Sequence, residues 1–241
     1  MKGNRLRFGF GWRAVLLAAV GLMQINLWGQ RIPLEIVQFP AVDYPESART
    51  SEYPTGLAQV AIYVDGEGQL QDALLLGASL PVFGETAMEA VRKWSYHPAR
   101  VGENPITVRK VIEFEFSAEG SVVTRSPSGH LQERVRSMTG PGLASRMAGL
   151  ADLDTPLQAI EAISPQPVSV PSRTEITVNF FVDEDGQPRM PIVQSGDHPG
   201  AIGAALEAVR DWRFTPVRKN GKPAVVEVSQ PFVFHPAVAE N

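Results

Sequence analysis

The 241-residue sequence has no cysteine, which excludes disulfides, thiolate metal ligands and cysteine nucleophiles. It also has only 4 histidines, and their spacing is not that of metal ligands. No phosphate-binding loop, cofactor fingerprint or general acid–base pair is found. The sequence therefore predicts a protein that is not an enzyme, with no cofactor and no metal. The histidines are His97, His130, His198 and His235.

Long apolar runs are scarce as well. The longest near the start, Ala14–Met23, has 10 residues, whereas a membrane-spanning helix needs about 20. Basic residues from Lys2 to Arg13 precede this run, and no acid occurs before Glu35. A basic start followed by a short apolar stretch is typical of a secretory signal, here ending near Gly29. An uncleaved N-terminal membrane anchor is the alternative.

Positive charge is in short supply, because 22 Lys and Arg stand against 26 Asp and Glu. Residues 1–29 hold four of the basic residues and no acid, so their removal lowers the net charge from −4 to −8. Proteins that bind phosphate backbones have clustered Lys and Arg, often interleaved with aromatic residues. Nucleic acid is therefore not an expected partner.

An internal duplication organises most of the chain. A shift of 118 residues aligns Val60–Phe116 with Val178–Phe234 without a gap and gives 18 identities in 57 positions. Ordinary composition would give roughly 3 or 4. A self-similarity of this strength indicates two copies of one structural unit.

Each copy predicts the order β-β-α-β. Period-two alternation, as in Val60, Ile62 and Val64, indicates a first strand. The turns "DGEG" (Asp65–Gly68) and "DEDG" (Asp183–Gly186) then close a hairpin, in which the last Gly supplies a positive φ. A helix follows, with apolar residues at i, i+4 and i+7 that include a Trp. The six expected structural anchors are Gly68, Trp94, Pro98, Gly186, Trp212 and Pro216.

The predicted fold class is therefore α+β. Two tandem β-β-α-β units each form a small antiparallel sheet with one main helix packed on one face. We expect domains at residues 30–116 and 153–236, a connector at 117–152, and a tail at 237–241. Within the connector, "HLQERVRSM" (His130–Met138) has the spacing of a short helix.

The motifs of both copies resemble the TonB C-terminal domain family. The resemblance covers about residues 39–116 and 164–235 and depends most on the Trp-aromatic-Pro ending of the helix. The matching stretches are "YPESA" (Tyr44–Ala48), "VDGEGQ" (Val64–Gln69), "AMEAVRKWSYHPA" (Ala87–Ala99), "IEFEF" (Ile112–Phe116), "VDEDGQ" (Val182–Gln187), "ALEAVRDWRFTP" (Ala205–Pro216) and "KNGKP" (Lys219–Pro223).

The resemblance implies a location and a way of binding. The family acts in the periplasm of Gram-negative bacteria and captures a segment of an outer-membrane receptor by strand addition at its last strand. Its full-length energy transducers also have an inner-membrane helix and a long spacer. Here only Gln30–Phe39 separates the apolar run from the first copy, a reach of roughly 33 Å. A periplasmic binding module is thus the first interpretation. The alternative is an energy transducer that a single N-terminal anchor holds in the inner membrane, facing the periplasm.

The last strand of copy one is the expected partner-binding edge. Its apolar face is expected to pack under the helix, while the other face is mostly polar and expected to face solvent. In copy two, Pro231 lacks an N–H on the equivalent strand, so copy two is expected to pack against copy one or a second chain. If the copies pair and leave no edge free, a structural envelope role is the remaining alternative. The expected edge residues are Thr107, Arg109, Val111, Glu113 and Glu115.

Two motifs resemble catalytic or metal sites only superficially. "QSGDHP" (Gln194–Pro199) places Ser195, Asp197 and His198 together, but catalytic triads are assembled from distant parts of a chain. A polar loop with a helix N-cap is the expected reading. "DEDG" lacks the downstream ligands of a calcium loop and is expected to be a turn.

Overall fold

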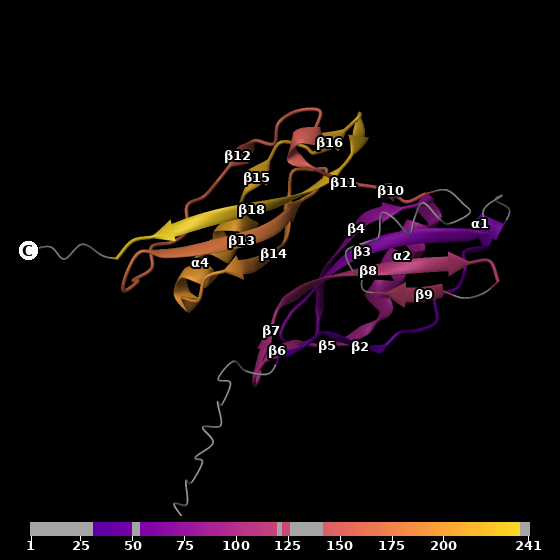
Figure 1. The fold of residues 1–241 in the computed structure, drawn as a ribbon, viewed down its shortest axis with the longest axis horizontal. Coiled ribbons are helices and arrows are strands. Elements are labelled where there is room, and N and C mark those ends of the chain that lie inside the picture. Colours follow the sequence, from indigo (N-terminus) through magenta and orange to yellow (C-terminus); the bar gives the residue numbers. More distant parts are fainter. Residues whose placement is uncertain (1–30, 50–53, 120–121, 126–141, 237–241) are drawn as a thin grey trace, which may run out of the picture.

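The computed structural model describes residues 31–49, 54–119, 122–125 and 142–236 (Figure 1). The predicted signal segment 1–29, the tail 237–241 and the predicted helix His130–Met138 lie outside the described residues. Two α+β units lie side by side, and each contains one of the sequence repeats. We call them copy one and copy two.

Copy one has the predicted β-β-α-β order. Its main elements are β3 (Thr55–Val64), β4 (Leu70–Ala78), α2 (Pro81–Lys93) and β8 (Val108–Ser117). They belong to a five-stranded sheet of order β10-β4-β3-β8-β9, which adds β10 (Ala144–Ser145) and β9 (Val122–Arg125) at its edges. The smaller elements are β1 (Arg31–Ile32), β2 (Glu35–Gln38), α1 (Glu46–Arg49), β5 (Ser95–His97), β6 (Ala99–Val101) and β7 (Asn104–Ile106).

Copy two repeats this order with β13 (Thr174–Val182), β14 (Pro188–Ser195), α4 (Pro199–Arg210) and β18 (Val225–Phe234). Its four-stranded sheet has the order β11-β18-β13-β14. All pairs in it are antiparallel except β11 with β18. The α+β class and the antiparallel sheets are as predicted. The smaller elements are β11 (Met147–Ala148), η1 (Leu150–Asp152), β12 (Ala159–Glu161), β15 (Arg213–Phe214), β16 (Arg218–Lys219) and β17 (Lys222–Pro223).

The hairpin turns have the geometry that the sequence predicts. Gly68 has φ +81° and Gly186 has φ +77°, and a Cβ at either position would collide with a carbonyl oxygen of Tyr96 or Phe214. Asp65 accepts hydrogen bonds from the backbone N–H groups of Glu67 and Gln69. The bond from Gln69 is the main reason why the pKa of Asp65 lies below its ordinary value. Only Gly can occupy these positions without strain.

Each copy has its own aromatic core beneath its helix. In copy one, Trp94 is 7% exposed and stacks on Phe114 at 5.4 Å between ring centroids. In copy two, Trp212 is 8% exposed and lies 5.6 Å from Phe232. Pro98 and Pro216 follow the short strands β5 and β15 that come after each Trp. The two sheets are therefore stabilised by separate sets of residues on their helix-facing sides.

Candidate functional site

The faces of the two sheets that point away from the helices pack against each other. Ala61 and Tyr63 of β3 lie on the opposite side of that strand from Val60 and Ile62, which pack under α2. They form a third apolar cluster with residues of copy two, of which Phe181 and Met190 are 3% and 2% exposed. The other members are Leu74, Leu76 and Val225, with Val111, Met147 and Ile192 at the margin.

Polar contacts fix the relative position of the copies. The Tyr63 hydroxyl donates a 2.8 Å hydrogen bond to the carbonyl oxygen of Pro191 in copy two. Burial raises the pKa of Tyr63, so the hydroxyl keeps its proton and remains a donor. The position of Tyr63 in copy one is that of Phe181 in copy two, 118 residues later. The two copies therefore contribute different side chains from the same position to one interface.

Arg189 of copy two connects acids from both copies. Its Nε donates to Asp72 of copy one at 2.8 Å, and its Nη1 donates to Asp183 of its own hairpin at 2.9 Å. The hydrogen bond to Asp72 raises the pKa of Arg189 further above its ordinary value, although burial opposes this shift. Such a two-point, charge-assisted contact is geometrically specific.

Arg109 makes a second such link from copy one. Its guanidinium lies over the Phe181 ring, 4.1 Å from the centroid, and pairs with Glu227. Positions 109 and 227 are equivalent in the repeat, so like positions of the two last strands meet here. The side chain of Arg109 is only 10% exposed.

The connector completes the link by strand pairing. β10 pairs with β4 of copy one, and β11 pairs with β18 of copy two. Between them, the Arg146 N–H donates to Leu76 O and the Arg146 carbonyl accepts from Val225 N–H, both at 2.7 Å. The Arg146 side chain also pairs with Glu184. One short segment of this chain is thus added as a strand to the edges of both sheets.

The predicted partner-binding edge on β8 is only partly open. β9 pairs with Glu113–Phe116, so the positions of Glu113 and Glu115 face a strand of this same chain. Thr107 precedes β8 and is exposed, while Arg109 and Val111 lie in the stretch Val108–Ile112, which pairs only with β3 among the described residues.

The expectation that the polar face of β8 faces solvent was wrong for Arg109 and Glu113. Glu113 is 4% exposed and Arg109 is covered by copy two. The sequence pattern identified the face correctly as the one opposite the helix. It could not show that a second sheet covers that face.

The direction of the β8 amides follows from the strand period. Ala118 N–H donates to Pro54 O, next to the start of β3, so even-numbered residues of β8 direct their N–H groups toward β3. The register between Val108 and Ser117 is unbroken. The N–H groups of Arg109 and Val111 therefore point away from β3, as an added strand would require.

Copy two also has open edges among the described residues. β14 pairs only with β13, and β18 pairs with β11 only at Val225 and Val226. Val225 donates outward to Arg146, so the odd-numbered residues of β18 face this edge, and Pro231 leaves a gap in its row of donors.

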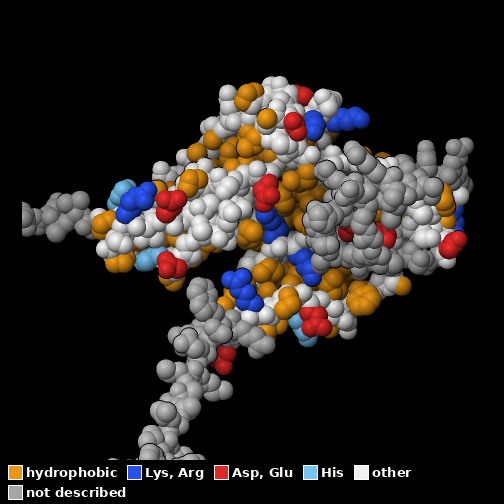
Figure 2. Space-filling view, viewed as in Figure 1, with side chains coloured by type: hydrophobic (Ala, Val, Ile, Leu, Met, Phe, Trp, Pro, Cys, Tyr) orange, Lys and Arg blue, Asp and Glu red, His pale blue; other side chains and the backbone are white. Residues whose placement is uncertain are grey.

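A groove of about 580 Å³ runs between the open part of β8 and the end of β14. Val108, Arg109 and Lys110 line it from copy one, and Val193 and Gln194 line it from copy two. Figure 2 shows basic side chains beside apolar ones where the two copies meet.

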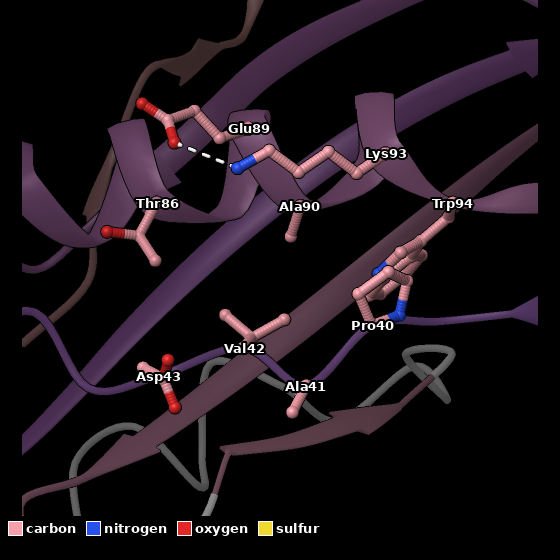
Figure 3. A pocket seen from close by; sticks show the side chains of 9 residues that line it. All are labelled: Pro40, Ala41, Val42, Asp43, Thr86, Glu89, Ala90, Lys93 and Trp94. Carbon is pink, nitrogen blue, oxygen red and sulfur yellow. Dashed lines mark ion pairs between the residues drawn. The ribbon is translucent and has the colours of Figure 1, made fainter.

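A smaller hollow of about 190 Å³ lies beside α2 (Figure 3). Glu89 and Lys93 form an ion pair on its rim, and Trp94 and Pro40 close one end. The Trp94 indole N–H has no hydrogen-bond partner among the described residues, whereas that of Trp212 donates to Ile163 O at 2.8 Å. This hollow is small and its rim is internally paired, so it is not the main candidate site.

The remaining sequence motifs have structural roles. His198 is the N-cap of α4 and accepts a hydrogen bond from Ala201 N–H, as the loop interpretation of "QSGDHP" predicted. Asp183 closes the copy-two hairpin as predicted, through bonds from Asp185 and Gln187 N–H. Within the described ranges, no group of acids and histidines could hold a metal, and no helix is long and apolar enough to span a membrane.

Comparison with known proteins gives one family. The model of the family described as "Gram-negative bacterial TonB protein C-terminal" matches residues 40–118 and 173–236. These segments coincide with the two copies. No curated protein and no solved structure matches the chain.

Proposed function

Because this chain belongs to the TonB C-terminal family and carries two tandem copies of its domain, we propose that it captures an extended segment of an envelope protein by strand addition at β8. The family consists of periplasmic protein-interaction domains without a catalytic role. We further propose that this protein is exported to the periplasm and that its partner is an outer-membrane receptor or another envelope protein.

One observation carries the proposal: Val108–Ile112 pairs with β3 on one side and with no strand of the described residues on the other. An open edge offers backbone donors and acceptors that a partner strand can satisfy. The chain already binds its own segments in this way, at β9, β10 and β11. Strand addition is therefore a mode of contact that both sheets accommodate.

A structural envelope role is the second candidate, because the two copies do pair with each other. That role required that pairing leave no free edge. The copies instead meet through the faces of their sheets, and part of β8 and β14 remains open among the described residues. The observed pairing therefore leaves the binding role intact.

A proline substitution tests the β8 edge. Val111→Pro removes an N–H that points away from β3, so the β3 ladder keeps its bonds. Ser229→Pro is the matched control, because it makes the same change at the equivalent position of β18. We expect Val111→Pro to reduce capture of outer-membrane proteins from an envelope extract by about tenfold, and Ser229→Pro to leave it unchanged.

Circular dichroism and urea unfolding must first show that both variants are folded. Equal capture by Val111→Pro and the wild type would remove strand addition at β8. Loss in Ser229→Pro alone would move the binding edge to β18.

A further inference from the structure

The groove between the copies has an unusual charge for this protein. Its lining includes the cations Arg31, Arg100, Arg109 and Lys110 and no acidic side chain, in a chain of net charge −4. Arg109 is neutralised by Glu227, and Lys110 Nζ lies 3.5 Å from Leu34 O. Arg31 and Arg100 are exposed, and Arg100 donates a hydrogen bond to the backbone oxygen of Glu103 without being neutralised by it. The lining therefore has a net positive charge.

Apolar side chains lie among these cations. Ile32 is 47% exposed, and Val101 and Ile106 are each 37% exposed, although large apolar side chains are usually buried. All three come from the small sheet β1-β6-β7 and line the same groove. The strand register places Arg31 on the same face of this sheet as Val101 and Ile106, and Arg100 on the same face as Ile32. Basic and exposed apolar side chains therefore occur together on each face.

We infer that this groove binds an extended peptide segment that carries both acidic and apolar side chains. Its acidic side chains pair with Arg31 or Arg100, and its apolar side chains pack against Ile32, Val101 or Ile106. The backbone of the segment meets the outward N–H groups of Arg109 and Val111. The inference rests on the proposed function and adds to it the chemistry of the partner.

The position of the groove explains why the tandem arrangement matters. Most of the lining belongs to copy one, and Val193 and Gln194 of copy two complete it beside β8. A segment added to β8 would therefore contact side chains of both copies.

The test uses the full chain and a synthetic peptide of alternating Glu and Val, about eight residues long, near the usual strand length. Calorimetry compares it with a peptide of alternating Lys and Val. We expect the acidic peptide to bind and the basic peptide not to bind. Affinity should fall about tenfold in the Arg31→Glu/Arg100→Glu variant, and it should also fall with added salt.

Arg92→Glu/Arg218→Glu is the matched control, since it changes the net charge equally at exposed positions outside the groove. This control should bind like the wild type. Equal weakening in both variants, equal binding of both peptides, or no binding of the acidic peptide would overturn the inference. A wild-type dimer that excludes the peptide in sedimentation would show that a second copy occupies the groove, which would also overturn it.

The inference and the proposed function can fail separately. If Val111→Pro abolishes capture of envelope proteins while Arg31→Glu/Arg100→Glu does not weaken it, strand addition at β8 stands and the acidic segment is wrong. If neither substitution has an effect, both fail.

Discussion

At the scale of single residues, the two copies differ where they touch. Tyr63 and Phe181 occupy equivalent positions, yet only Tyr63 donates a hydrogen bond across the interface. Arg109 and Glu227 are equivalent as well and have opposite charges. These differences make the interface asymmetric, because each copy contributes different side chains from equivalent positions.

Tyr63→Phe should weaken the contact between the copies by about 1 kcal/mol, because Pro191 O loses its donor. The raised pKa of Tyr63 means that its contribution is complete below about pH 10. It is lost as the pH rises above that value, where the unfolded chain ionises first. The free energy of unfolding, measured with urea between about pH 9 and pH 11, should fall less steeply with pH in Tyr63→Phe than in the wild type.

Tyr96→Phe is the comparison for this experiment, because burial also raises the pKa of Tyr96 while its hydroxyl donates to Val91 O within copy one. Tyr96→Phe should therefore flatten the pH profile as well, but it should leave the contact between the copies unchanged. Identical pH profiles for the wild type and Tyr63→Phe would show that the Tyr63 hydroxyl is not buried at the interface.

Asp72 and Arg189 should be energetically coupled although they are 117 residues apart. In a double-mutant cycle of Asp72→Ala and Arg189→Ala, we expect a coupling of about 1.5–3 kcal/mol, as for hydrogen bonds to charged groups. Urea unfolding provides the free energies. A coupling near zero would mean that the copies do not meet at this point in solution.

At this scale the sequence predicts local geometry well. Asp65 and Gly68 were assigned to a hairpin turn because turn chemistry depends on neighbouring residues alone. The partner of Arg189 could not be predicted, because the residues around Arg189 do not indicate which carboxylate of the other copy lies next to it.

At the scale of elements, the period-two pattern predicts which face of a strand packs under the helix, but it does not predict what covers the opposite face. The alternation of Val60, Ile62 and Val64 predicts that they share one face of a strand, and all three are buried in the cluster under α2. The run Leu74–Leu76 was a sign of burial on both faces, because consecutive apolar residues are typical of strands covered twice. β9 was not predicted, so the covered half of the β8 edge was missed.

Trp94 directly follows α2, Trp212 lies two residues beyond the end of α4, and each fills its own core. Trp94→Ala and Trp212→Ala should each cost about 3–5 kcal/mol, as expected when a large buried aromatic side chain is removed. The loss should be local, because the two Trp residues belong to different apolar clusters. Limited proteolysis of each variant identifies the half that is cut first. Unfolding of residues 39–116 in Trp212→Ala would show that the interface makes the copies one cooperative unit.

At the scale of the whole molecule, the duplication produces two similar domains and also a set of contacts between them. The faces pair, the connector adds a strand to each sheet, and the groove forms between the copies. The duplication and the family can be predicted from the sequence alone, because identical residues recur at the turn, Trp and Pro positions of both copies. The interface between the copies cannot be predicted in this way, because it depends on how two similar surfaces fit together.

Export is the remaining prediction at this scale. The basic and apolar composition of residues 1–29 predicts cleavage near Gly29, so protein recovered from the periplasm should begin at about Gln30. N-terminal sequencing determines this directly. An intact Met1 in inner-membrane fractions would favour the anchored energy transducer instead.

Amide hydrogen exchange of β8, with and without the acidic peptide, tests the central claim most directly. Without peptide, Lys110 and Ile112 should already be protected, because their N–H groups face β3, while those of Arg109 and Val111 exchange faster. Strand addition predicts that the peptide protects Arg109 and Val111 and leaves their neighbours unchanged. If bound peptide slows exchange at neither residue, the partner does not add to this strand.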